Sequence, residues 1–113
     1  MIIIQISKDY AEEPGGRYKK DGAFSGEEFR ETILYPKYQA AIQSGEKIQI
    51  NLDDCYGFPS SFIEEAFGGL ARQTKNVNLL NYFEFISEDE PSLIDKIKRC
   101  IANALNKENI NEI

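Results

Sequence analysis

The sequence predicts an α/β domain with a largely parallel four-stranded sheet, in the element order ββαβαβα, and with helices packed on that sheet. Short apolar segments alternate along the chain with segments whose apolar residues recur at helical spacing. The 113 residues, 42% of them hydrophobic, supply enough apolar side chains for one core and too few residues for a second domain. We therefore expect residues 1–113 to form a single domain, with a frayed tail at residues 107–113.

Four segments are predicted as strands. Residues 2–6 are mostly apolar, and residues 17–20, between two Gly-containing turns, are expected to pair with them as a hairpin. Residues 47–53 alternate apolar and polar side chains with a period of two, which is typical of a strand. Residues 82–86 form the last strand of the predicted sheet.

The first predicted helix begins near Ser25, which has capping-box spacing to Glu28, and it ends at Gly45. Pro36 falls inside this pattern, where it is expected to kink the helix or split it into two pieces. The helix at residues 59–70 carries apolar residues over a wide arc and should be the most buried. Its Gly68–Gly69 pair should permit close approach of the backbone to the sheet or to a neighbouring element.

The last helix is predicted to start near Pro91. Its apolar stripe consists of Leu93 or Ile94, Ile97, Ile101 and Leu105.

The composition excludes several classes of function. With 13 Lys and Arg against 19 Asp and Glu, the net charge is -6, so we expect neither nucleic acid nor membrane as a partner. The absence of His removes the commonest general base and the commonest metal ligand, and we expect no metal and no cofactor. No signal peptide and no membrane-spanning segment is expected, and Cys55 and Cys100 are interpreted as reduced thiols of a cytoplasmic protein.

Ser60 and Ser61 follow the loop at the carboxyl end of the third predicted strand. Loops and helix N-termini meet at this edge of a parallel sheet, and ligands and modifications collect there. Ser61 and Glu64 have capping-box spacing, which predicts that Ser61 caps the helix. An exposed serine at a helix N-terminus is also a favourable place for a phosphate, and the two interpretations are compatible.

Two further groups of residues are candidates for ligand binding. Asp53 and Asp54, at the end of the third strand, are compatible with a cation or phosphoacceptor site, although most loop acids of this kind are simply solvated. Gly15, Gly16 and Arg17 are compatible with an anion nest, although turn glycines beside a surface arginine explain them equally well.

Three sequence runs, taken in order, resemble those of a known family. They are PGGRY at residues 14–18, SGEEFR at residues 25–30, and SSFIEEAFGGL at residues 60–70, the last of which follows the strand residues INLD at 50–53. Together they resemble the bacterial STAS-like domains of unknown function, over almost the whole chain.

The resemblance implies a relative of the anti-sigma-factor antagonists, a small α/β domain without catalysis of its own. Such a domain binds a protein partner, often an ATPase of the histidine-kinase-like class, and here the contact would be made by residues 57–70. The residues that the resemblance places in that contact are Phe58, Ser60, Ser61, Glu64, Glu65 and Gly68. It also maps the phosphorylated serine of related domains onto Ser60 or Ser61.

Two hypotheses from other classes stay open. The protein is alternatively a small-ligand or nucleotide sensor, or an enzyme, that uses Asp53, Asp54 and Arg17 at the sheet edge. It is alternatively a structural oligomer that associates through the aromatic segment at residues 82–85.

Overall fold

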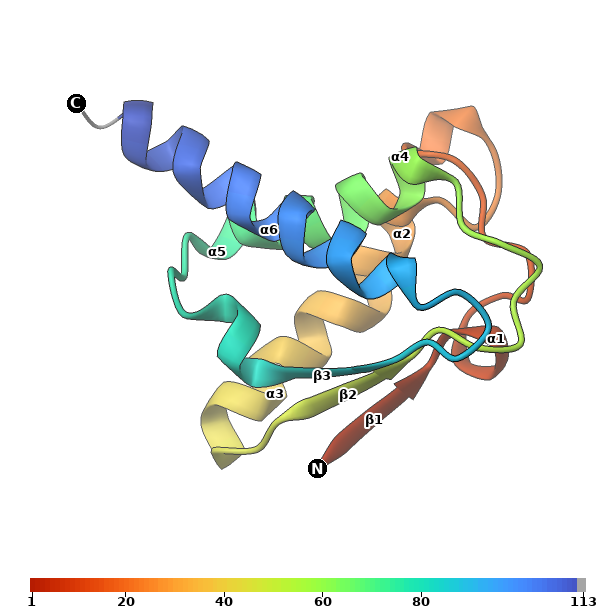
Figure 1. The fold of residues 1–113 in the computed structure, drawn as a ribbon, viewed down its shortest axis with the longest axis horizontal. Coiled ribbons are helices and arrows are strands. Elements are labelled where there is room, and N and C mark those ends of the chain that lie inside the picture. The colour runs from red at the N-terminus through yellow and green to blue at the C-terminus, as the bar shows by residue number, and fades with distance from the viewer. Residues whose placement is uncertain (112–113) are drawn as a thin grey trace.

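A three-stranded parallel sheet is the centre of the fold. The computed structural model describes residues 1–111, and the side chains of residues 1–106. The strands are β1 (Ile2–Gln5), β2 (Ile48–Asn51) and β3 (Phe83–Ile86), hydrogen-bonded in the order β1-β2-β3. Each strand ends at the same edge of the sheet, where the loops on the right of Figure 1 come together. The predicted α/β class is confirmed, with three strands among the described residues instead of four.

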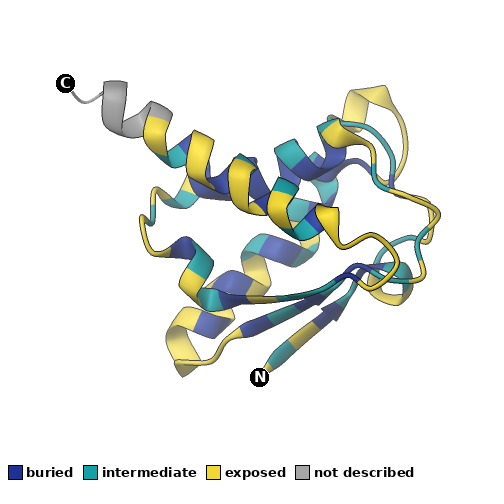
Figure 2. Ribbon diagram, in the orientation of Figure 1, coloured by how far each residue is buried: buried dark blue, intermediate teal, exposed yellow. Residues whose placement is uncertain are grey.

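One face of the sheet is covered by helices, and the other is open. Ile4, Ile50 and Phe83 are buried on the covered face. On the opposite face Ile3 is 61% exposed, and Glu84 is also exposed. Figure 2 shows this alternation along the strands. Right-handed crossovers between successive parallel strands place all the intervening helices on one side, which explains the two-layer arrangement.

The first crossover is helical over most of its length. It contains α1 (Ile6–Asp9), the short 3-10 helix η1 (Lys19–Asp21), α2 (Gly26–Phe29), the π-helical turn η2 (Arg30–Leu34) and α3 (Tyr35–Ser44). The predicted boundaries are confirmed, because Ser25 Oγ accepts the Glu28 amide at 3.0 Å and Gly45 ends α3 in the left-handed conformation, at φ 72°. Of the two effects expected of Pro36, a kink or a split of the helix, the split does not occur. The backbone stays helical, and the irregular turn lies just before this proline.

The second crossover and the C-terminal helix complete the covering layer. They comprise α4 (Ser60–Ile63), the π-helical turn η3 (Glu64–Gly68), α5 (Gly69–Thr74), the 3-10 helix η4 (Leu79–Tyr82) and α6 (Ser92–Asn111). Residues 62–71 are all buried except Glu64, as expected for the most buried helix. Leu93, Ile97 and Ile101 of α6 are buried as predicted, and Leu105 packs against the core. The side chains of residues 107–113 lie outside the described part of the structure, so the frayed tail predicted there stays a prediction.

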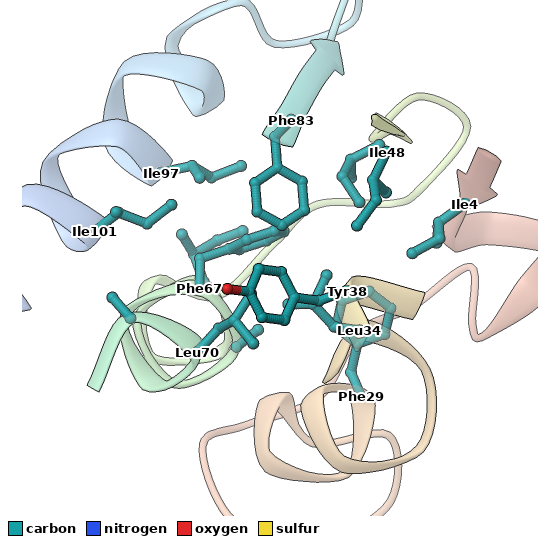
Figure 3. Close-up of a cluster of buried hydrophobic side chains, with 14 of the residues drawn as sticks. Ile4, Phe29, Leu34, Tyr38, Ile48, Phe67, Leu70, Phe83, Ile97 and Ile101 are labelled. Carbon is teal, nitrogen blue, oxygen red and sulfur yellow. The ribbon is translucent and has the colours of Figure 1, made fainter. Parts of the chain in front are cut away.

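Aromatic rings join the helices to the sheet. The ring centroid of Phe29 lies 5.7 Å from that of Phe62 and 6.4 Å from that of Phe67. Phe67 in turn lies 6.1 Å from Phe85 of β3. Figure 3 shows side chains from α2, α3, α5, α6 and the strands pointing into this one cluster.

The prediction of a second strand at residues 17–20 is wrong. The amide of Tyr18 donates to the Asp21 carboxylate at 3.1 Å, and the amide of Lys19 donates to the Glu27 carboxylate at 2.9 Å. Asp21 itself closes a 3-10 turn on the carbonyl of Tyr18. Carboxylates therefore take the backbone donors that a ladder would need, and the segment forms a folded loop.

Candidate functional site

Three loops meet at the carboxyl edge of the sheet, where backbone amides of one loop donate to carbonyl or carboxylate oxygens of another. The amide of Tyr56, after β2, donates to the carbonyl of Glu12, after β1, at 2.8 Å. Asp53 Oδ1 accepts the amide of Asp89, and Asp89 Oδ2 accepts the amide of Asp54, both at 2.9 Å. This reciprocal pair fixes the loop after β2 against the loop after β3.

Aromatic side chains lead from the core to the surface at this edge. Tyr56 is 83% exposed, and Phe58, two residues later, is half-buried with its ring centroid 5.8 Å from that of Phe62. Tyr10 lies 6.3 Å from Phe62 and 5.7 Å from Phe24, which is 47% exposed. Large exposed rings at the end of a packed series are typical of a contact surface. We call Tyr56, Phe58 and Ser60 the Tyr56 surface.

Neither candidate serine caps its helix, so the predicted capping box is wrong. The N-cap residue of α4 is Pro59, which makes no side-chain hydrogen bond, and α4 begins at Ser60. Ser60 is exposed and Ser61 is half-buried. The Glu64 carboxylate, which a capping box would direct back to the helix N-terminus, is instead held by arginines.

Beside α4 lies a group of five charged side chains, which we call the charged cluster. Glu64 accepts hydrogen bonds from Arg17 Nη1 at 2.5 Å and from Arg72 Nη1 at 2.7 Å. Glu65, 8% exposed, accepts from Arg30 Nη1 at 2.6 Å and lies 3.4 Å from Arg17 Nη1. The Arg72 hydrogen bond, followed by that of Arg17, holds the pKa of Glu64 below its usual value, although partial burial opposes this.

Gly68 and Gly69 make room for the charged cluster. A Cβ atom on Gly69 would overlap Nη1 of Arg30, and a Cβ atom on Gly68 would overlap Oε2 of Glu64. The predicted close approach to a neighbouring element is confirmed for Gly69, whose neighbour is Arg30 of η2, whereas Gly68 lies against Glu64 of its own helical turn.

In the predicted anion nest, the Gly15 amide and the Arg17 side chain already have partners within the protein. The amide of Gly15 donates to the carbonyl of Phe24 at 2.8 Å, and the carbonyl of Gly16 accepts the amide of Gly26. The guanidinium of Arg17 is engaged with the two glutamates of the charged cluster. The loop after β1 is therefore fastened to α2 by Gly16 and to the π-helical turn η3 by Arg17.

The acidic residues of the alternative site are separated from their predicted arginine. Asp53 and Asp54 bond to the loop after β3, whereas every ion pair of Arg17 recorded among the described residues is with Glu64 or Glu65. No group of three or more His, Cys, Asp or Glu in the described part of the chain is placed to hold a metal ion. Within residues 1–111, no helix combines the length and the apolar character needed to cross a membrane.

The two cysteines are free and half-buried. Burial raises the pKa of the Cys55 thiol to about 11, and the nearby carboxylates, Asp54 foremost, raise it in the same direction. Burial also raises the pKa of Cys100. Thiols in such surroundings are poor nucleophiles.

Only part of the predicted contact set lies at the surface. Phe58, Ser61 and Glu64 are half-buried and Ser60 is exposed, whereas Glu65 and Gly68 are buried beneath neighbouring side chains. In this structure those two residues shape the charged cluster and are not presented to a partner. The aromatic segment at residues 82–85 is likewise turned inward, since its rings pack against the core.

Sequence reasoning missed Tyr56, Arg30 and Arg72. The exposure of Tyr56 could have been predicted, because an aromatic residue that precedes a glycine in a predicted loop is not expected to be buried in the core. The roles of Arg30 and Arg72 could not have been predicted, because their partners lie on another helix or on a helical turn whose π geometry is not visible in the sequence.

Comparison with protein families matches residues 25–93 to a family described as STAS-like domain of unknown function (DUF4325). The match covers more than half of the chain and includes α2, β2, α4 and β3. Searches of curated proteins and of solved structures gave no match.

Proposed function

Because the chain belongs to the family of STAS-like domains of unknown function, we propose that it acts as a regulatory module that binds a protein partner and catalyses no reaction of its own. The observation that carries the proposal is the Tyr56 surface. An 83% exposed tyrosine there stands beside a half-buried phenylalanine and an exposed serine, on a loop that is hydrogen-bonded to its neighbour. Large aromatic side chains on a fixed loop supply contact area at little cost in conformational entropy.

The partner implied by the resemblance is an ATPase of the histidine-kinase-like class. The surface it would meet has aromatic residues at its centre and acidic residues at its margin, among them the exposed Asp54 and Asp89. A partner with an apolar pocket rimmed by Lys or Arg fits this pattern.

The charged cluster favours Ser61 over Ser60 as the regulated residue. At about 100° per residue, the direction of Ser61 lies between those of Glu64 and Glu65, one helical turn before them, whereas that of Ser60 falls outside this range. Arg17 donates hydrogen bonds to Glu64 and to Glu65, and both bonds come from its Nη1 atom. A phosphate on Ser61 would therefore meet a guanidinium that has further donors for it.

Partner binding is tested with two matched substitutions. Tyr56→Ser removes the ring at the carboxyl edge of the sheet, and Val77→Ser removes a 66% exposed apolar side chain from the loop that precedes β3, at the other edge. Tagged versions are purified from the native cell, and the co-purifying ATPase is quantified by mass spectrometry. We expect at least tenfold lower recovery with Tyr56→Ser and unchanged recovery with Val77→Ser; equal recovery with both would refute the Tyr56 surface as the contact.

The phosphorylation proposal has a separate test. Phosphoserine is installed at residue 61 or at residue 60, and the second phosphate pKa is measured by phosphorus NMR. A neighbouring guanidinium stabilises the dianion, so this pKa should be lower at residue 61 than at residue 60, and Arg17→Gln should remove the difference. Equal values at the two positions would contradict the role of Arg17, whatever the outcome for partner binding.

A second candidate function rests on a cavity of about 250 Å³ at the same edge of the sheet, lined in part by Cys55, Phe58, Ser87 and Leu93. Its position at the carboxyl ends of β2 and β3 is where parallel sheets hold small ligands. Calorimetry against Mg²⁺ and against nucleotides tests the sensor hypothesis, and heat of binding that Phe58→Ala abolishes would favour it over the partner module.

A further inference from the structure

A second cavity, of about 340 Å³, lies where the two π-helical turns meet. Arg30 comes from the start of η2, and Arg72 comes from α5, directly after η3. Interruptions of this kind occur frequently at functional sites in helices. The residues that line the cavity are Arg30, Glu31, Glu65, Gly69, Arg72 and Gln73.

The charge balance of this region is the opposite of that of the chain. The charged cluster holds three guanidiniums against two carboxylates, although the whole chain has a net charge of -6. The remaining acid of the lining, Glu31, is paired with Lys19 Nζ at 2.5 Å. The charged cluster therefore carries one excess positive charge, and two of its three arginines line the cavity together with Glu31 and Glu65.

The hydrogen-bond donors of Arg30 are only partly used. Its Nη1 donates to the backbone carbonyl and to Oε2 of Glu65, both at 2.6 Å, while its Nε is buried without a partner in the protein. Arg72 is bound to Glu64 through Nη1 and Nη2. Since each guanidinium carries five N–H groups and no acceptor, both arginines keep donors that the two glutamates do not use and that an acceptor in the cavity can bind.

Gly69 leaves room for the Arg30 guanidinium, which is held by the carboxylate and the backbone carbonyl of Glu65. Any side chain in place of Gly69 would overlap Nη1, and the Arg30 side chain is only 14% exposed. A guanidinium fork that is already ordered and largely dehydrated matches the oxygens of a tetrahedral oxyanion, and little further ordering is needed on binding.

We propose that this cavity binds a small phosphate-bearing ligand, with Arg30, Arg72 and Gln73 as its donors. The cavity is larger than a phosphate group, which leaves space for the organic part of a small monoester. The site is distinct from the Tyr56 surface and does not depend on the proposed partner.

The test uses the whole chain and NMR of the arginine side-chain Nε–Hε groups. Inorganic phosphate and glycerol 3-phosphate are titrated separately, with chloride added to keep the ionic strength constant. A saturable shift of the Arg30 signal, together with a melting temperature that rises with ligand concentration, is the expected result. Tenfold tighter binding of the monoester identifies an organic phosphate as the ligand, and equal binding identifies free phosphate.

Variants distinguish this site from general anion effects. Arg72→Lys should weaken phosphate binding at least tenfold, whereas Arg99→Lys, on the exposed side of α6, should leave it unchanged. Gln73 lines the cavity and is exposed, so Gln73→Ala should not disturb the fold. This variant therefore still tests the site if Arg72→Lys fails to fold. Shifts that do not saturate, that chloride reproduces, or that persist in full in both lining variants would overturn the proposal.

Discussion

The Glu65→Gln substitution removes the negative charge that is buried against Arg30. Glu65 is 8% exposed, the Arg30 side chain is 14% exposed, and 2.6 Å separates Oε2 from Nη1. Removing one charge of a buried pair costs about 3–5 kcal/mol, because the other charge stays desolvated without compensation. Gln retains an oxygen acceptor, and the backbone carbonyl of residue 65 still binds Nη1. We therefore expect a loss of about 2 kcal/mol from the free energy of unfolding.

Urea denaturation followed by circular dichroism measures this loss. With a urea m-value of about 1.5 kcal/mol/M for a domain of this size, the midpoint should fall by about 1.3 M. The shift should persist at high salt, because a buried pair is only weakly screened.

Glu31→Gln is the matched control, since it removes an exposed carboxylate that is paired with the exposed Lys19. Its effect on the midpoint should be small and should vanish at high salt. If Glu65→Gln shifts the midpoint no more than Glu31→Gln does, the charged cluster does not stabilise the contact between the helices.

Three further predictions concern packing and titration. Gly26→Ala would place a Cβ atom 2.5 Å from the carbonyl oxygen of Phe62, so α2 and α4 must separate; we expect about 2 kcal/mol lower stability, and an unchanged melting temperature would contradict this. The pKa of Glu64 is lowered in the folded state by the Arg72 hydrogen bond, so its contribution to stability is present above the unfolded pKa of about 4.3 and is lost as the pH falls through the folded pKa. Urea midpoints measured from pH 2 to pH 6 should therefore depend less on pH in Glu64→Gln than in the unchanged chain. Because burial raises the pKa of Cys55 to about 11, its alkylation by iodoacetamide, read by peptide mass spectrometry, should be slow at pH 8 and faster toward pH 11; fast labelling at pH 8 would contradict this.

Features that depend on local signals were predictable. Ser25 caps its helix because its hydroxyl needs only the amide three residues later, and Gly45 ends α3 because its φ of 72° is rare for any residue with a Cβ. The alternation of apolar and polar residues in β2 follows from its one buried face, and it can be read without knowledge of the partner strands.

Features that depend on distant charges were not predictable. Ser61 and Glu64 have the spacing of a capping box, but Arg17 and Arg72 bind that carboxylate more favourably than a backbone amide does. The loop at residues 17–20 resembles a strand in sequence only, because carboxylates that lie up to eight residues further along take its amides. The candidate phosphate cavity likewise joins residues that are far apart in the sequence, Arg30 and Arg72 among them, so sequence spacing alone gave no indication of it.

The position of β2 between the other two strands has a consequence for how the chain reaches its folded state. Both pairings of β2 join segments that are far apart along the chain, so each requires the closure of a long loop before it contributes any stability. The first half, from β1 to β2, carries Phe29 but not the rings of Phe62 and Phe67 that cover it. Ile97 and Ile101, which close the core, come last. During synthesis, therefore, no early fragment can bury its apolar surface, and the domain folds only after most of α6 has left the ribosome.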